Sequence, residues 1–369
     1  MKNVEDILCD LINIRTDNVN NSNKEIVEYI CQILKNEHVL YYRLRAKDGI
    51  KENLVAVIGA SRLKNIRGLV LSGHMDTVPA NEKEWETSPF RATISDGKIY
   101  GRGAVDMKFF IACVLSIIPQ IKNTELPVIL SFSCDEETHV HGIKEICAFF
   151  KENNIFPQFA LVGEPTDFNL RVGHKGYYGF TTNIKGKSAH SSHPERGINA
   201  IFAASHIISE IEKLSRFFSN QDTTLNVGFI NGGEQRNSIP SEVSFDWEIR
   251  SFNEKPMQTI ISKIKKYHEE IQKKYPGLQI NVIAKEIMPV FEQRKPGKLH
   301  RLASNILKTQ DVTSFSATEA GFLQKEGIET LICGVTCSET AHTAYEHIKI
   351  ADLEKYKNFL KELIFALNK

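Results

Sequence analysis

The feature that most constrains the fold is a short apolar segment followed by a histidine and an aspartate. Residues Leu69–Leu71 are predicted to form a buried strand, and Gly73 is predicted to mark where the chain leaves the sheet. His74 and Asp76 are two residues apart, so in an extended chain their side chains point to the same side. A metal-binding histidine commonly donates its second ring N–H to a carboxylate. The pair is therefore a candidate part of a metal site.

Acidic residues recur at the ends of later predicted strands. Asp106 lies in a glycine-rich turn, residues Asp135–Glu137 follow one strand, and Glu164 follows the next. Strands alternate with helices in this half of the chain: strands Leu54–Ile58, Leu69–Leu71, Val128–Phe132 and Phe159–Val162, and helices Phe109–Ile121 and Gly142–Glu152. The alternation predicts an α/β domain with a mixed, largely parallel sheet. Ligand sites in such sheets lie beyond the carboxyl ends of the strands, so these acids are expected to converge.

The pattern changes near residue 173 and changes back near residue 286. The intervening elements follow the order βαββαβ of the ferredoxin-like arrangement: Tyr177–Ile184, Asn199–Leu214, Thr224–Ile230, Val243–Ile249, Met257–Lys274 and Leu278–Ile283. We therefore expect residues 173–285 to be a domain inserted into a discontinuous domain formed by residues 1–172 and 286–369. In the latter, Ser22 and Glu25 have the spacing of a helix capping box, and Thr330–Cys333 is expected to be a strand.

Length and composition are those of a globular protein with two domains. The chain has 369 residues, of which 41% are hydrophobic and 25% charged, and its net charge of +1 does not favour nucleic acid or an anionic membrane as a partner. The seven cysteines are scattered and include no C-x-x-C pair, which favours reduced thiols. The acidic N-terminus is unlike a secretory leader, and no apolar run could span a bilayer. These features predict a cytoplasmic protein.

The converging side chains form a ligand set suited to zinc or its chemical neighbours. The set consists of imidazoles and carboxylates: His74, Asp106, Glu136, Glu137, Glu164 and the late His342. It holds one carboxylate more than a single tetrahedral ion needs, which favours two metal ions with a bridging carboxylate and one acid free to act as a base. The alternative is that the acids are solvated loop residues, and their repetition at strand ends counts against it.

Six motifs together resemble the zinc-dependent amidohydrolases that include acetylornithine deacetylase, succinyl-diaminopimelate desuccinylase and aminoacylase. The motifs are Ser72–Pro79, Gly101–Lys108, Asp135–Glu137, Gly163–Thr166, Gly186–Ser192 and Ala341–His342. The resemblance extends over nearly the whole chain. It implies two zinc ions in each subunit, with cobalt able to replace them, and a small N-acyl amino acid as the substrate.

The resemblance also implies a role for each candidate residue of the metal centre. His74 and Glu164 would bind one zinc ion, and Glu137 and His342 the other. Asp106 would bridge the two ions. Asp76 would orient His74, and Glu136 would be the general base.

In the inserted domain, the resemblance implies a lid through which two subunits form a homodimer. His190 would stabilise the oxyanion in the partner subunit's active site. Asn237 and Arg250 would hold the carboxylate of the substrate.

Within the family, His174–Gly176, His190–Ala200 and Thr318–Ala320 resemble the acetylornithine deacetylase branch. The resemblance implies hydrolysis of N-acetyl-ornithine in arginine biosynthesis. N-acetyl-citrulline, N-succinyl-diaminopimelate or a dipeptide are alternative substrates, and a non-catalytic metal-binding homologue is an alternative of another class. Phe109 departs from the family, most members of which carry glycine after Asp-Met-Lys. Glu319 would either contact a cationic substrate tail or serve as a structural acid.

Several nearby residues have simpler interpretations. His139 and His141 are expected in a solvated loop, and His193 on the surface of the inserted domain. Glu346 and His347 either support the metal site or merely begin the last helix.

Overall fold

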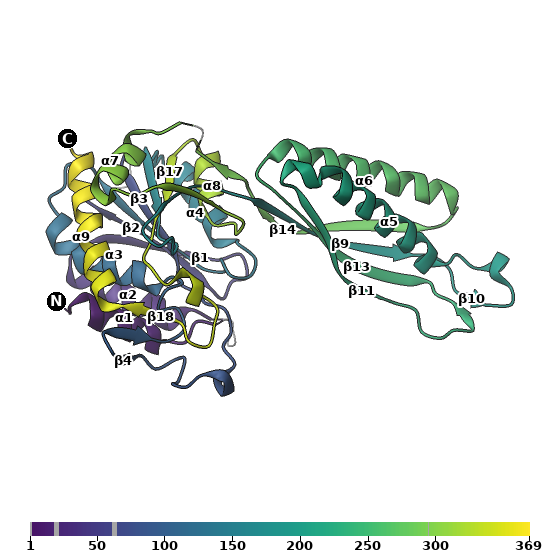
Figure 1. The fold of residues 1–369 in the computed structure, drawn as a ribbon, viewed down its shortest axis with the longest axis horizontal. Helices are drawn as coiled ribbons and strands as arrows, with labels where there is room; N and C mark the ends of the chain where they lie inside the picture. Colours follow the sequence, from purple (N-terminus) through teal and green to yellow (C-terminus); the bar gives the residue numbers. More distant parts are fainter. Residues whose placement is uncertain (1, 18–21, 61–64, 294) are drawn as a thin grey trace. The chain divides into compact units, whose positions relative to one another are not determined.

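The computed structural model describes residues 2–17, 22–60, 65–293 and 295–369, which form two compact units (Figure 1). The first unit comprises Met1–Gly173, Gln293–Ser314 and Thr318–Lys369, and the second comprises His174–Glu292 and Phe315–Ala317. The chain re-enters the first unit later than residue 286. The reason is that strand β14 (Gln279–Met288) continues to pair with β9 (Gly176–Lys185) as far as the Met288–Tyr177 pair.

The first unit is built on a mixed sheet whose central strands are parallel. The strand order is β1-β2-β6-β3-β7-β17-β8, with β16 (Asp311–Ser314) paired to β8. The bounds are β1 Leu40–Arg45, β2 Glu52–Ile58, β6 Val128–Ser133, β3 Leu69–His74, β7 Phe159–Val162, β17 Glu329–Ile332 and β8 Leu170–His174. Strands β6, β3, β7 and β17 run parallel, β2 and β8 pair antiparallel with the two outer strands of this set, and β1 pairs antiparallel with β2. The predicted fold class is confirmed.

Helix α3 (Lys108–Ile121) lies at the centre of the first unit's core, and nearly all of its side chains are buried. It packs against α1 (Val4–Asn13) and α9 (Ile350–Leu367). Among the described residues, the other α-helices of this unit are α2 (Lys24–Asn36), α4 (Gly142–Glu152), α7 (Lys298–Leu307) and α8 (Ala320–Lys325). Phe109 is fully buried on α3 and meets the ring of Tyr356 edge-on at a centroid distance of 5.3 Å. Its bulk therefore fills the core and faces helix α9.

The predicted capping box at the start of α2 is wrong. The helix begins at Lys24 after the N-cap residue Asn23, and the Ser22 hydroxyl accepts the Lys24 N–H at 3.3 Å. The Asn23 side chain instead bonds the backbone N–H and carbonyl of Glu52, at 3.0 and 2.8 Å. These two bonds join the start of the helix to strand β2. The spacing of residues within the helix could not predict them, because the partner lies in another segment of the chain.

The second unit has the predicted element order βαββαβ. Its antiparallel sheet has the strand order β11-β13-β9-β14, with β11 at Thr224–Gly232 and β13 at Glu242–Ser251. Helices α5 (Ala200–Phe218) and α6 (Glu254–Lys274) lie side by side along the sheet (Figure 1). The alternating side chains Val243, Phe245, Trp247 and Ile249 of β13 are buried with the apolar faces of these helices. A small ribbon of β10 (Ala189–His190) and β12 (Ser238–Ile239) extends the unit.

Candidate metal centre and active site

Three neighbouring parallel strands bring most of the candidate ligands to one edge of the sheet. Strand β3 ends at His74, β6 ends just before residues Asp135–Glu137, and β7 ends just before Glu164. Gly73 is still within β3, so the predicted strand end was too early. Glycine is required at position 73 because of close packing and not because the strand ends there. A Cβ atom at this position would lie only 2.7–2.8 Å from the side chains of Met107 and Phe110. The start of helix α3 therefore packs closely against the end of strand β3.

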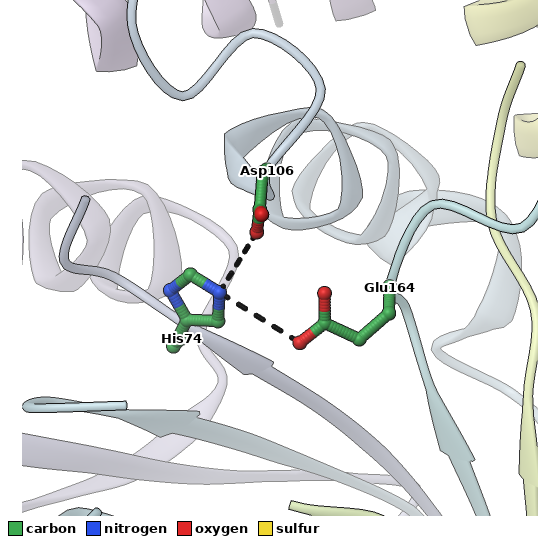
Figure 2. A group of neighbouring side chains, drawn as sticks. All are labelled: His74, Asp106 and Glu164. Atoms are coloured by element: carbon green, nitrogen blue, oxygen red, sulfur yellow. Dashed lines mark hydrogen bonds and ion pairs between the residues drawn. The ribbon is translucent and has the colours of Figure 1, made fainter. Parts of the chain in front are cut away.

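His74 faces two carboxylates (Figure 2). Its Nε2 atom lies 3.1 Å from Asp106 Oδ1 and 3.7 Å from Glu164 Oε1. Its Nδ1 atom is 2.9 Å from the backbone carbonyl of Asp76. Because a carbonyl can only accept, Nδ1 carries a proton and donates it. Although burial opposes the charged ring, the hydrogen bond between Nε2 and Asp106 and the charges of Glu136 and Glu164 raise the pKa of His74 well above its usual value. Nε2 is thus the atom that would face a metal ion held between these groups. The ring is oriented as a metal ligand would be.

Asp106 is shared with a second group. Its other oxygen, Oδ2, lies 3.2 Å from His342 Nε2, and the same nitrogen is 3.0 Å from Glu137 Oε1. Each oxygen of Asp106 therefore faces a different imidazole, which is the arrangement expected of a carboxylate that bridges two metal ions. The ligand atoms of His74, Asp106 and Glu164, and those of Asp106, Glu137 and His342, each lie within 4.8 Å of one another.

Electrostatics show how the cluster is balanced without a cation. Hydrogen bonds to Asp106 and Glu137 raise the pKa of His342 to about 10. Burial and the charge of Asp106 raise the pKa of Glu164 to about 8, whereas the two imidazoles hold the pKa of Asp106 below its usual range despite burial. Protons on His342 and Glu164 thus offset the negative charge of the clustered carboxylates, and bound metal ions would replace these protons. Imidazole and carboxylate ligands packed this closely fit a pair of divalent ions.

Glu136 lies beside these ligands and shares their environment. Its carboxylate is within 4.8 Å of ligand atoms of His74 and Glu137. Loss of solvent, reinforced by the neighbouring carboxylates of Glu164 and Glu137, raises its pKa well above the ordinary range. A carboxylate with a raised pKa is suited to take a proton near neutral pH and to return it.

Asp76 contacts His74 chiefly through its backbone. The Asp76 carboxylate is 3.7 Å from His74 Nδ1, while its two oxygens accept the backbone N–H groups of Glu136 at 3.2 Å and Glu137 at 3.1 Å. Asp76 is thus also the residue that holds the turn carrying Glu136 and Glu137. Sequence reasoning missed this role because the bonds join segments 60 residues apart.

A buried ion pair supports the same turn from the other side. The Lys51 ammonium contacts the carboxylate of Asp135, and both side chains are buried. Asp135 has a left-handed backbone with φ of 63°. Nothing in the sequence pattern near Lys51 indicated this pairing.

Glu319 is buried near the sheet edge at the N-terminus of α8. One carboxylate oxygen accepts the Ser72 hydroxyl at 3.0 Å, and the other accepts the hydroxyl of Ser133. These two serines belong to the neighbouring strands β3 and β6. The contacts favour the structural interpretation of Glu319 over contact with a substrate tail.

The remaining predicted site residues belong to the second unit. His190 is exposed in β10, and its Nδ1 atom is 2.6 Å from Ser192 Oγ. The carbonyl of Asn237 accepts the Ser191 N–H at 3.0 Å, so Asn237 and His190 lie on adjacent segments. Arg250 lies on β13, where its guanidinium bonds Glu248 at 2.9 Å and stacks over the ring of Tyr177. His139 and His141 are exposed, and their rings stack at 5.8 Å.

An imidazole and carboxylate cluster beyond the ends of parallel strands, with a free acid beside it, defines a metal-dependent hydrolase. The sequence profile described as Peptidase family M20/M25/M40 matches residues 70–366. This chain belongs to that family, and the resemblance found in the sequence is confirmed. Within the described residues, no helix is long and apolar enough to cross a membrane.

Known proteins similar to this chain span nearly all of its length. An acetylornithine deacetylase of Buchnera aphidicola subsp. Schizaphis graminum is 30% identical over 93% of this chain and 91% of its own. The crystal structure of a tripeptidase from Staphylococcus aureus has a TM-score of 0.79 at 22% identity and covers 99% of this chain and 98% of its own. A dinuclear metal-binding peptidase of the M20 family from Bacillus subtilis has a TM-score of 0.68 at 17% identity, with coverage of 99% and 97%.

Proposed function

We propose that this protein hydrolyses the amide bond of N-acetyl-ornithine to release acetate and ornithine. The observation that carries the proposal is Asp106 placed between two imidazoles, with Glu136 free beside the cluster. Supporting it, a relative named acetylornithine deacetylase is 30% identical over nearly the full length of both chains.

Two divalent metal ions fit the ligand set, and we propose zinc, with cobalt able to replace it. His74 and Glu164 would hold one ion, Glu137 and His342 the other, and Asp106 both. When bound, such ions polarise a carbonyl group and acidify water, which lowers the barrier to amide hydrolysis.

The protein's own groups would handle the protons. Glu136 would accept a proton from the attacking water as the oxygen bonds to the acyl carbon. As the C–N bond breaks, Glu136 would return this proton to the nitrogen of the leaving amine. The backbone bond from Glu136 to Asp76 keeps the base in place during both transfers.

The second unit would complete the site. We propose that it forms a homodimer contact, that His190 stabilises the oxyanion in the partner subunit's site, and that Asn237 and Arg250 hold the substrate carboxylate. We further propose that the enzyme acts in the cytoplasm, in arginine biosynthesis. The seven free cysteines support a reducing compartment.

A substrate panel tests the proposal. The purified protein, loaded with zinc or cobalt, is assayed against N-acetyl-ornithine, N-acetyl-citrulline, N-succinyl-diaminopimelate and a dipeptide. We expect the highest kcat/KM for N-acetyl-ornithine. An equal or higher value for another compound would reassign the substrate, and inactivity on all of them in a metal-loaded protein would favour a non-catalytic homologue.

A further inference from the structure

The buried ion pair of Glu346 and Arg102 lies outside the ligand set and forms hydrogen bonds with the backbone at Asp106, the proposed bridging ligand. Glu346 is fully buried, and one of its oxygens, Oε1, accepts the backbone N–H groups of Val105 at 3.0 Å and Asp106 at 3.1 Å. Its other oxygen, Oε2, accepts a hydrogen bond from Arg102 Nη1 at 2.6 Å. The Glu346 carboxylate thus closes a ring of contacts around the turn that presents Asp106.

The same pair connects two of the three segments that supply ligands to the second metal position, those of Asp106 and His342. His342 lies four residues before Glu346, and Asp106 lies four residues after Arg102. Strand β18 (His347–Lys349) pairs antiparallel with β5 (Lys98–Tyr100), and Gly101 N–H donates to the Glu346 carbonyl at 3.1 Å. This pairing sets the register that brings the Glu346 carboxylate under the turn.

Arg102 is itself held on several sides. Its side chain is 3% exposed, its guanidinium lies 5.4 Å from the centre of the Trp85 ring, and its backbone N–H donates to the Pro89 carbonyl at 2.8 Å. Burying two charges costs solvation that their attraction only partly offsets, so such a pair is weak evidence for a role in stability. The Glu346 carboxylate nevertheless accepts hydrogen bonds from the backbone of Asp106 and its neighbour, which is better explained by a need to position Asp106.

We propose that Glu346 and Arg102 are positioning residues that fix Asp106 between the two metal positions and join its turn to the segment carrying His342. The inference rests on the proposed function only in taking Asp106 as the bridging ligand. It has a specific consequence. Since Asp106 faces both His74 and His342, loss of the pair weakens both metal positions, whereas loss of His342 weakens one.

The test is a cobalt titration of the metal-free protein, followed by visible absorption, with wild type, Glu346→Gln and His342→Ala compared. A glutamine at 346 can still accept the two backbone N–H groups through its oxygen, but its amide N–H then faces the Arg102 donors, so the ring of contacts cannot close. Outer partners of metal ligands change metal affinity by roughly 10–100-fold. We expect a loss of that size for both cobalt ions in Glu346→Gln, and for one ion in His342→Ala.

Glu329→Gln is the matched control. The Glu329 carboxylate also accepts two backbone N–H groups, of Lys298 at 3.0 Å and His300 at 3.2 Å, but contacts none of the proposed ligands. Its cobalt titration should match that of wild type. Thermal unfolding of each metal-free variant separates a loss of folding from a loss of metal positioning.

A cobalt titration of Glu346→Gln that superimposes on wild type overturns the proposal, as does a loss at only one of the two positions. A lower melting temperature with unchanged cobalt affinity would show that the pair is structural. If Glu346→Gln does not fold, Arg102→Lys replaces it: lysine keeps the charge but lacks the planar fork, and we expect weaker binding of both ions. Because no substrate is used, wild type that binds cobalt but does not cleave N-acetyl-ornithine refutes the proposed function alone.

Discussion

Replacing Glu136 with glutamine isolates the proposed general base. Glutamine has nearly the same shape as glutamate. The backbone N–H of residue 136, which donates to the Asp76 carboxylate at 3.2 Å in the wild-type protein, would keep this bond in the variant. The two ligand groups that share Asp106, namely His74–Asp106–Glu164 and Asp106–Glu137–His342, do not contain Glu136, so metal content should be unchanged. Only the proton acceptor is lost. General base catalysis contributes about 10²–10⁴ in rate, so kcat/KM should fall by that factor, or roughly 2.7–5.4 kcal/mol of transition-state stabilisation.

The assay combines kcat/KM for N-acetyl-ornithine with metal analysis of the same preparation. Glu137→Gln is the matched control, because Glu137 contacts His342 at 3.0 Å and its loss should release metal as well as activity. Two results would refute the assignment: Glu136→Gln with wild-type activity, or Glu136→Gln that has lost its metal.

Four further outcomes are expected. Chelation should abolish activity, with zinc or cobalt restoring it, and metal affinity should fall with decreasing pH because the His342 and Glu164 protons, with pKa values of about 10 and about 8, must leave. The folded metal-free protein binds the His342 proton more tightly than the unfolded chain does, so chemical unfolding should show stability declining between about pH 6.5 and 10. Glu319→Gln should lower the free energy of unfolding by about 1–3 kcal/mol without raising KM, whereas a substrate-tail role would raise KM for N-acetyl-ornithine selectively. The His190→Ala homodimer and the Glu136→Ala homodimer should each be nearly inactive. Mixed dimers of the two variants, verified by differential tagging, should recover towards half of wild-type activity, because one of their two sites is complete. Mixed dimers that stay inactive would refute the sharing of sites between subunits.

The predictions that depend on local periodicity agree with the structure. The strand predicted at Phe159–Val162 and the helix at Gly142–Glu152 have the observed bounds. Alternating side chains in a half-buried strand and apolar residues at helical spacing reflect which face is buried, and a short window of sequence contains that information. Helix α1, which the sequence analysis did not predict, follows the same rule: Ile7, Leu8 and Leu11 are buried.

The convergence of the ligands was also accessible from the sequence. Parallel strands end at one edge of a sheet, so residues following β3, β6 and β7 must lie near one another once the strands are neighbours. The sequence itself therefore determined the chemical class of the site.

Contacts that hold the ligands were decided only by tertiary structure. The Glu346 carboxylate reaches the Asp106 N–H across 240 residues, and Glu319 meets Ser72 across 247. Neither bond produces a periodic pattern in the sequence. Each depends on the register of the strands and on which side chain fills the space below a turn. Residue identity supplies the chemistry of donors and acceptors, but only the folded chain determines which donor meets which acceptor.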